Sequence, residues 1–278
     1  MASSRALLTT ATALLGAAGV DSARVDAELL LAHSLGVERS RLTLVDTVPT
    51  EAEAAFAKVL ARRVLREPLQ YIVGRAPFRN LEVLVGPGVF IPRPETELLV
   101  DAVLPTLQAV SAPIVVDLCA GTGALALAIA DEVPGARAYA VERSTAALEW
   151  LRRNTAATTV QVVAADVRDS ALLVELRATV DAVVCNPPYV PRAQSVEPEV
   201  RADPDDAVFA GPDGMALMPA VAARAAQLLR AGGVLAVEHD DTQGESMPEL
   251  LGDLGCWADI RAHLDLSGRP RYVSAVRH

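Results

Sequence analysis

The sequence is poor in lysine and in aromatic residues, and each shortage narrows what the chain can be. Lys58 is the only lysine among 278 residues, and the formal net charge is −10. Because phosphate backbones are bound by clustered Lys and Arg, this balance argues against general binding of DNA or RNA. Aromatic residues make up only 4% of the chain, so its cores must be built mainly from Leu, Val and Ala.

Cysteines and long apolar runs are also scarce. Cys119, Cys185 and Cys256 lie far apart without metal-ligand spacing, which predicts a reducing compartment and no metal site. No run approaches the roughly 20 apolar residues that a membrane span needs. The Ala- and Leu-rich start of the chain is interrupted by threonines, so it fits an amphipathic helix better than a signal peptide. These features predict a cytoplasmic protein.

The order of the patterns predicts two domains and a linker. Residues 1–68 have helical periodicity, and Thr50 with Glu53 has the form of a capping box. Residues 69–96 hold the β-rich segments "YIVG" and "LEVLV" and a Pro/Gly-rich loop, which indicate a β-hairpin linker. In residues 97–278 strands alternate with helices, which is typical of an α/β domain with a mostly parallel sheet. Two of its predicted helices cover 170–178 and 214–229.

Acidic residues and glycines end the first three predicted strands of the α/β domain, where such sheets bind ligands. The first strand ends in "DLCAGTG" (117–123), whose glycines let a ligand approach the backbone. Glu142 ends the second strand and can accept hydrogen bonds from ribose hydroxyls, and Asp166 ends the third, near an expected adenine edge. Asp117 would repel phosphate but suits a cationic amine or sulfonium. S-adenosylmethionine fits this pattern; a nucleotide site and a purely structural turn are the alternatives.

The fourth strand ends in "NPPY", Asn186 to Tyr189, at the same edge of the sheet. A planar amide or amino nitrogen is a weak nucleophile because its lone pair is delocalised. The side-chain oxygen of Asn186 and the backbone carbonyl of Pro187 can accept both of its N–H groups, and Tyr189 can stack on the flat group. Positioning and electrostatics would then carry methyl transfer. A plain strand-ending turn is the alternative interpretation.

Segments spread along almost the whole chain resemble the release-factor glutamine methyltransferases (the PrmC/HemK family). These segments are "REPLQYIVGRAPF", "GPGVFIPRPETELLV", "DLCAGTGALALA", "CNPPYVP", "EPEVRADPDDAVFAGPDGM" and "GGVLAVEH". The resemblance implies a Rossmann-like class I methyltransferase fold, dependent on S-adenosylmethionine, with a mostly parallel seven-stranded sheet. It also implies a small all-α N-terminal domain, a hairpin linker, and methylation of N5 of the glutamine in the Gly-Gly-Gln motif of class 1 peptide release factors. We expect a monomer.

The resemblance assigns roles to individual residues. Asn186, Pro187 and Tyr189 would be catalytic, and with Pro188 they would hold the glutamine. Residues Phe90, Pro92 and Arg93 would line the pocket between the domains. The cofactor would be held by residues at the strand ends, namely Asp117, Cys119, Ala120, Gly121, Thr122, Gly123, Glu142, Asp166, Val167 and Asn186.

Two positions depart from the family pattern. Cys119 stands where members usually have glycine, so we expect this position to avoid a glycine-only conformation and to contact the cofactor through its main chain. Val167 stands where a large aromatic often flanks the adenine, so we expect weaker stacking. Glu238 and His239 end a further strand at the same edge and could touch the pocket. The acidic loop after the NPPY segment is expected to close over the substrate.

Two other functions are compatible with parts of the pattern. A nucleic-acid amino methyltransferase of the adenine N6 type would use the same NPPY group, but it must also extract a base and bind phosphates. The pI of 4.9 and the single lysine speak against it. A scaffold protein that only retains the fold would be expected to lose its catalytic group, and Asn186 to Tyr189 is intact.

Overall fold

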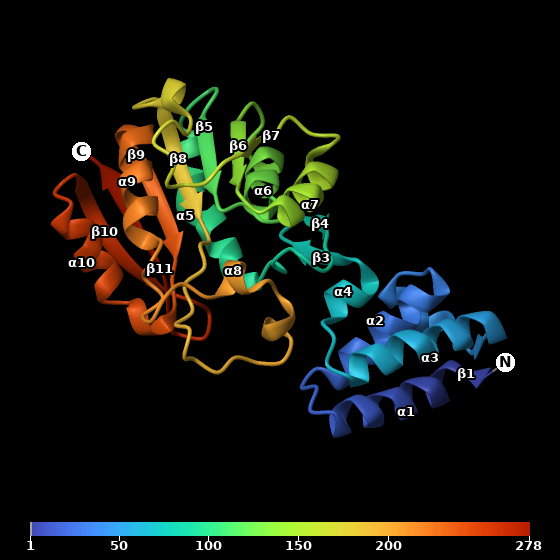
Figure 1. Cartoon of the computed structure of the whole chain (residues 1–278). Helices are drawn as coiled ribbons and strands as arrows, with labels where there is room; N and C mark the ends of the chain where they lie inside the picture. Colours follow the sequence, from blue (N-terminus) through green and yellow to red (C-terminus); the bar gives the residue numbers. More distant parts are fainter. Residues whose placement is uncertain (1) are drawn as a thin grey trace. The chain divides into compact units, whose positions relative to one another are not determined.

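The computed structural model describes residues 2–278, which form two compact units (Figure 1). The smaller unit contains the chain up to Arg75 together with the segment Val196–Ala202. The larger unit contains Ala76–Ser195 and Asp203–His278. The sequence pattern did not indicate that a segment from the second half of the chain belongs to the helical unit. No helix within residues 2–278 has the length and apolar character to cross a bilayer.

The smaller unit is a helical bundle around an aliphatic core. Its elements are β1 (Ala2–Ser3), α1 (Ser4–Ala17), α2 (Ala23–Leu35), the 3₁₀ helix η1 (Arg39–Leu44), β2 (Thr47–Val48), α3 (Thr50–Val64) and α4 (Leu69–Val73). Leu15, Leu30 and Leu31 are fully buried at its centre. The helix α2 ends at Gly36 in the left-handed conformation, which favours glycine.

Two local predictions for this part of the chain are wrong. The "YIVG" segment is not a strand, because Pro68 precedes a short helix, α4, that ends at the left-handed Gly74. The hairpin is formed instead by β3 (Arg75–Phe78) and β4 (Leu81–Leu84). The capping box is also absent, because Pro49 occupies the N-cap position of α3 and Thr50 is already helical.

An ion-pair network joins Val196–Ala202 to the other elements of the smaller unit. Arg63 on α3 is buried and contacts both Asp26 and Glu199 at 2.7 Å. Arg66 contacts the same Glu199 carboxylate at 2.7 Å. Burial alone would raise the pKa of Glu199, but the hydrogen bonds from Arg66 and Arg63 hold it at about 2. The basic end of α3 is therefore paired with carboxylates.

The larger unit is built on a seven-stranded sheet with the order β10-β11-β9-β8-β5-β6-β7. Its strands are β5 (Ile114–Leu118), β6 (Arg137–Glu142), β7 (Gln161–Ala164), β8 (Val180–Cys185), β9 (Leu229–Glu238), β10 (Trp257–Leu264) and β11 (Pro270–Arg277). Strands β5 to β9 are parallel, and β10 and β11 are antiparallel. This confirms the predicted mostly parallel, seven-stranded α/β sheet.

Helices connect most of the successive strands of the sheet, as Figure 1 shows. They are α5 (Glu97–Gln108), α6 (Ala124–Glu132), α7 (Thr145–Thr155), α8 (Asp205–Val208), α9 (Met218–Leu228) and α10 (Ser246–Asp253), with the 3₁₀ helices η2 (Pro94–Thr96), η3 (Val174–Leu176), η4 (Val200–Ala202) and η5 (Asp241–Gln243). The helix predicted over 170–178 is mostly turn. The one predicted from 214 begins four residues later, because Gly214 adopts a left-handed turn.

The strand order places a switch point at β5. The chain runs from β5 outward to β6 and β7, then returns to the other side of β5 with β8 and β9. Leu118 pairs with Val141 on one side and with Cys185 on the other, so the carboxyl ends of these strands lie level. In open α/β sheets this is where ligands bind. Val116 and Val183, both fully buried, anchor the sheet beneath it.

Candidate active site

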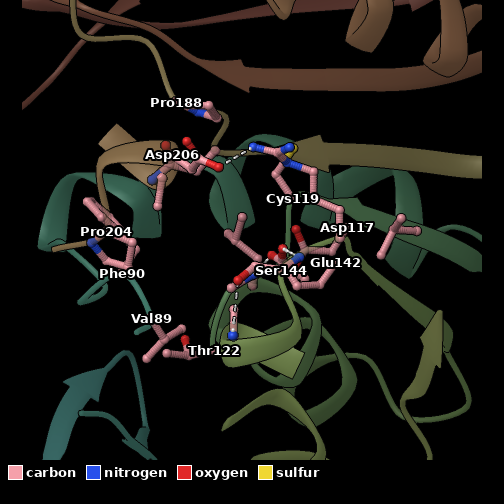
Figure 2. A pocket seen from close by; sticks show the side chains of 18 of the residues that line it. Val89, Phe90, Asp117, Cys119, Thr122, Glu142, Ser144, Pro188, Pro204 and Asp206 are labelled. Carbon is pink, nitrogen blue, oxygen red and sulfur yellow. Dashed lines mark hydrogen bonds and ion pairs between the residues drawn. The ribbon is translucent and has the colours of Figure 1, made fainter. Parts of the chain in front are cut away.

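A pocket opens at the carboxyl ends of β5, β6 and β8, entirely within the larger unit (Figure 2). It encloses about 990 Å³, open mouth included. Nine of the ten residues predicted to hold a cofactor line it, namely Asp117, Cys119, Ala120, Gly121, Thr122, Glu142, Asp166, Val167 and Asn186. In Figure 2, Asp117, Glu142 and Ser144 lie together on one side, and Phe90 and Pro204 lie on another.

Gly123 is the predicted cofactor residue that does not line the pocket, and its role is conformational. It caps α6 with a φ of +85°, and a Cβ there would lie 2.5 Å from Cδ1 of Leu151. Only glycine fits both the conformation and the space. Its amide donates to the Ala120 carbonyl at 2.7 Å, which closes the turn between β5 and α6.

Glu142 ties two strand-end loops together. One carboxylate oxygen accepts from the Gly121 amide at 2.9 Å, and the other accepts from the Ser144 amide at 2.7 Å. Carboxylate oxygens have lone pairs for further bonds, so Glu142 can still accept from hydroxyls in the pocket. The side chain predicted to bind ribose therefore also shapes the glycine loop.

Cys119 corrects one expectation. Its φ is +63°, which is the left-handed region that favours glycine, so the position does not avoid that conformation. Such a φ costs a non-glycine residue roughly 1–2 kcal/mol and persists only where neighbours enforce it. Here the next amide, that of Ala120, donates to the Val141 carbonyl of β6 at 2.9 Å and fixes the turn. The Cys119 side chain lines the pocket.

Asp117 is a buried carboxyl with an unused oxygen. Its Oδ2 accepts from the Ala126 amide at 3.2 Å, whereas Oδ1 has no hydrogen-bond partner among residues 2–278. Burial raises the pKa of Asp117 to about 8, against the opposing effect of the Ala126 bond, and the Glu142 charge adds to the rise. An unpaired buried acceptor in a pocket wall suits a cationic amine, so this residue fits the amino-acid end of S-adenosylmethionine.

The third strand end contributes a paired carboxylate and an apolar side chain to the pocket lining. Arg168 binds Asp166 with two N–H groups, and this pairing, the largest cause, lowers the pKa of Asp166 to about 2. Val167 is buried and lines the pocket. The buried Arg224 of α9 donates to the Val167 carbonyl at 3.3 Å and to the Asp169 carbonyl. The sequence reasoning did not identify this support.

Asn186 follows β8, next to the end of β5, where Leu118 pairs with Cys185. Its Nδ2 donates to Oγ1 of Thr96 at 2.9 Å, and both residues line the pocket. Within residues 2–278, neither the side-chain oxygen of Asn186 nor the Pro187 carbonyl accepts a hydrogen bond. Two acceptors thus remain available at the end of the strand, as a substrate with two N–H groups would need.

Tyr189 does not line the pocket. Its hydroxyl donates to Oε1 of Glu238 at 2.7 Å, and its carbonyl accepts from Nε2 of Gln243 at 3.0 Å. Gly214 packs so closely that a Cβ there would lie 1.9 Å from the Tyr189 carbonyl oxygen. Val190 then forms a β-bridge with Phe209. The acidic loop expected to close over the substrate therefore also braces the NPPY segment.

Of the other residues predicted at the substrate side, some line the pocket and one supports a lining residue. Phe90 and Pro92 line the pocket, and Pro188 does so from the NPPY segment. Arg93 does not; its guanidinium pairs with Asp203 at 2.5 Å and lies 5.2 Å from the centre of the Phe90 ring. Arg93 therefore holds Phe90 in place by a cation–π contact.

Several pocket residues were missed in the sequence. Thr96 lines the pocket, and no role was predicted for it. Glu238 and His239, which were predicted as residues that could touch the pocket, do not line it, and Glu238 is connected to the site through Thr96 and Tyr189. Arg143 and Asp206 both line the pocket and pair at 3.1 Å at its exposed edge, where Figure 2 marks the contact. No local pattern joins residues 63 positions apart. No His, Cys, Asp or Glu cluster within residues 2–278 could hold a metal.

The sheet order, the glycine loop and the acidic strand ends define a class I methyltransferase dependent on S-adenosylmethionine. A family described as "PrmC N-terminal domain" matches residues 6–74, and "Methyltransferase small domain" matches residues 80–201. A release factor glutamine methyltransferase of Mycolicibacterium smegmatis is 53% identical over 98% of this chain and 97% of its own length. One of Streptomyces coelicolor is 47% identical over 95% of each. The chain belongs to the release factor glutamine methyltransferase family.

The chain is also similar to a methyltransferase of another name and to two solved structures. A 4-amino-L-phenylalanine/4-methylamino-L-phenylalanine methyltransferase of Streptomyces pristinaespiralis is 41% identical over 90% of this chain and 88% of its own length. Among solved structures, the Thermus thermophilus 16S rRNA N2 G1207 methyltransferase (RsmC) has a TM-score of 0.51 and 23% identity, covering 73% of this chain and 50% of that one. The catalytic domain of hMettl16 has a TM-score of 0.56, 15% identity, and 79% and 81% coverage. These two structures share the fold.

Proposed function

We propose that this protein transfers a methyl group from S-adenosylmethionine to the side-chain amide N5 of the glutamine in the Gly-Gly-Gln motif of class 1 peptide release factors. The observation that carries this proposal is a pair of unengaged acceptors at the end of β8, namely Oδ1 of Asn186, which lines the pocket, and the carbonyl of Pro187, the next residue, which is not among the lining residues. Relatives that are 44–53% identical over nearly the whole chain are named release factor glutamine methyltransferases, which supports the proposal.

The cofactor half of the pocket would be held by four strand-end groups. Asp117 would bind the amino group with its free Oδ1, and the turn from Cys119 to Gly123 would bind through its main chain. Glu142 would accept hydrogen bonds from the ribose hydroxyls, and Asp166 with Val167 would flank the adenine. When bound, S-adenosylmethionine supplies a methyl group made electrophilic by its sulfonium.

The substrate half would act by orientation. Asn186 and Pro187 would accept the two amide hydrogens, which fixes the nitrogen and directs electron density toward it. Phe90 and Pro188 would contact the flat amide, with Tyr189 behind them. One N–H hydrogen is replaced by the methyl group, so one proton leaves the nitrogen. No strong base is needed before transfer, because that proton can leave afterwards.

The remaining expectations complete the proposal. The partner is a protein, direct binding of nucleic acid is not part of the activity, and the enzyme acts as a cytoplasmic monomer. The acidic balance of the chain supports the second point, because few cations are available to contact phosphates.

The test is methyl transfer from labelled S-adenosylmethionine to a purified class 1 release factor, followed by mass spectrometry of the Gly-Gly-Gln peptide. A Gln→Ala factor and bulk RNA and DNA serve as parallel acceptors. We expect one methyl group on that glutamine and none in the Ala factor. Label on nucleic acid would support the amino-methyltransferase alternative, and cofactor binding without transfer would support a scaffold.

A second candidate function follows from the relative that methylates 4-amino-L-phenylalanine. An aromatic amine is also planar and also offers two N–H hydrogens, so the same two acceptors could bind it. Adding 4-amino-L-phenylalanine as a third acceptor separates the two functions. Methylation of the free amino acid at a rate comparable with the release factor would make the small molecule the substrate.

A further inference from the structure

Two buried polar residues in the substrate half have no part in the proposed function. Thr96 and Glu238 are 4% and 1% exposed. Thr96 donates from Oγ1 to Oε2 of Glu238 at 2.7 Å, and Tyr189 donates its hydroxyl to Oε1 of the same carboxylate at 2.7 Å. With the Asn186 bond to Thr96, these contacts form one chain from Asn186 to Tyr189. Glu238 is the acceptor that Thr96 and Tyr189 share.

The direction of these bonds decides how the Asn186 amide is oriented. Thr96 has a single hydroxyl hydrogen, and it is used on Glu238. The Thr96 oxygen can therefore only accept from Asn186, so the amide must turn its NH₂ group toward Thr96 and Oδ1 away from it. No other hydrogen bond to the Asn186 side chain is formed within the described residues. An amide rotated by half a turn would present donors where the substrate nitrogen needs an acceptor.

We propose that Thr96 and Glu238 are positioning residues for methyl transfer, which orient the Asn186 amide and hold Tyr189 by its hydroxyl. The proposal rests on the proposed function for its chemistry. A carboxylate suits the shared position because it offers an acceptor to each donor at once. A glutamine there would offer one acceptor and one donor, so one of the two bonds would be lost.

Kinetics of four variants test the role. Thr96→Val keeps the shape and removes the hydroxyl, and we expect kcat for the release factor to fall roughly 10- to 100-fold. Thr96→Ser keeps the hydroxyl and should restore kcat to within about threefold of wild type. The kcat of Glu238→Gln should lie between the values for Thr96→Val and Thr96→Ser. Thr155→Val is the matched control, because Thr155 is another buried threonine of the larger unit and its hydroxyl bonds within its own helix, to Leu151.

The split between kinetic constants separates positioning from general damage. The Kd for S-adenosylmethionine, measured by calorimetry, should stay within about threefold in all four variants, because neither Thr96 nor Glu238 is among the residues proposed to hold the cofactor. Thr96→Val combined with Glu238→Gln should cost little more than Thr96→Val alone, because both interrupt one chain of bonds. Full additivity of the two effects would contradict a shared network.

An NMR measurement decides the geometry without any substrate. The sequence contains three asparagines, Asn80, Asn154 and Asn186, so ¹⁵N-asparagine labelling gives three side-chain NH₂ pairs. Asn186→Ala assigns one of them. We expect that pair to shift and to exchange faster with water in Thr96→Val but not in Thr96→Ser or Thr155→Val. Unchanged Asn186 resonances in Thr96→Val, or a kcat within about twofold of wild type, would overturn the proposal.

The two failures are distinguishable. A wild-type chain that methylates no release factor would contradict the proposed function, while the NH₂ shifts would still report whether Thr96 orients Asn186. A wild-type chain that is active, with a fully active Thr96→Val, would leave the function standing and remove the positioning role.

Discussion

The residues proposed to hold the cofactor, here called the cofactor wall, and those proposed to hold the substrate with their supports Thr96 and Glu238, here called the substrate wall, are fixed in different ways. On the cofactor wall, carboxylates bind backbone amides close in the chain: Glu142 reaches Gly121 across 21 positions, and Asp117 reaches Ala126 across nine. On the substrate wall, side chains bind side chains across 90, 142 and 49 positions. The cofactor wall therefore depends on the turns that end consecutive strands. The substrate wall depends on contacts between segments that are far apart in the sequence.

This difference has a consequence for mutation. Backbone amides remain when a neighbouring side chain is changed, so the cofactor wall should lose affinity gradually. A side-chain network acts as a unit, so a substitution in the substrate wall should lower kcat sharply. The affinity for S-adenosylmethionine should be retained. Variants of the two walls should thus move different kinetic constants.

The largest effect is expected for Asn186→Ala. It removes an acceptor from the substrate nitrogen, and preorganised groups of this kind contribute about 10²- to 10³-fold to kcat. The Kd for S-adenosylmethionine should change by less than about threefold. Methyl transfer assays and calorimetry on the same preparation measure both. Asn80→Ala, at an exposed position in the hairpin turn, is the control. An equally severe loss of cofactor affinity would show that Asn186 belongs to the other wall.

Glu142→Ala tests the cofactor wall. It frees the Gly121 and Ser144 amides and removes the proposed ribose acceptor, so we expect the Kd for S-adenosylmethionine to rise about 10- to 100-fold. At saturating cofactor, kcat should stay within about threefold. Glu175→Gln, at an exposed residue of η3, provides the comparison. A large fall in kcat with normal affinity would erase the distinction between the walls.

Arg224→Lys tests a long-range support of the same wall. The guanidinium binds two carbonyls of the loop that carries Val167, and a lysine ammonium cannot match that fork. We expect a three- to tenfold rise in the KM for S-adenosylmethionine, roughly one lost charged hydrogen bond after partial relaxation. The Arg177→Lys variant, at an exposed arginine of the same unit, should behave as wild type. An unchanged KM would mean that the loop holds its own shape.

The cofactor wall could be predicted from the sequence to a larger extent than the substrate wall. Strand ends, the glycine turn and the NPPY segment are local patterns, so the sheet and nine residues that line the pocket could be predicted. Thr96 and Arg224 could not, and Glu238 was predicted only as a residue that could touch the pocket, because the partners in these contacts lie 49 to 142 positions away and nothing local marks the pairing. Tyr189 was predicted to stack on the flat substrate group, whereas the bond from its hydroxyl to Glu238 was not predicted, because Glu238 lies 49 positions away.

A change in pH should alter the stability of the ligand-free protein through Asp117. Burial raises the pKa of this carboxyl to about 8, whereas an aspartate in an unfolded chain titrates near about 4. Between these values the folded chain holds a proton that the unfolded chain does not. The free energy of unfolding of the ligand-free protein should therefore decrease as pH rises from about 4 to about 8, and level off above that.

The measurement compares Tm between pH 6 and pH 8 for the wild type and Asp117→Asn. The wild type should lose roughly 5 °C more than the variant, whose amide does not titrate. Calorimetry of S-adenosylmethionine binding in buffers of different ionisation enthalpy gives the matching test, because an ammonium beside Oδ1 favours the carboxylate and should release close to one proton at pH 7. Parallel Tm curves and proton-free binding would mean that Asp117 is ionised before the cofactor arrives. The cofactor wall would then hold a permanent negative charge, with electrostatic attraction acting from the first encounter.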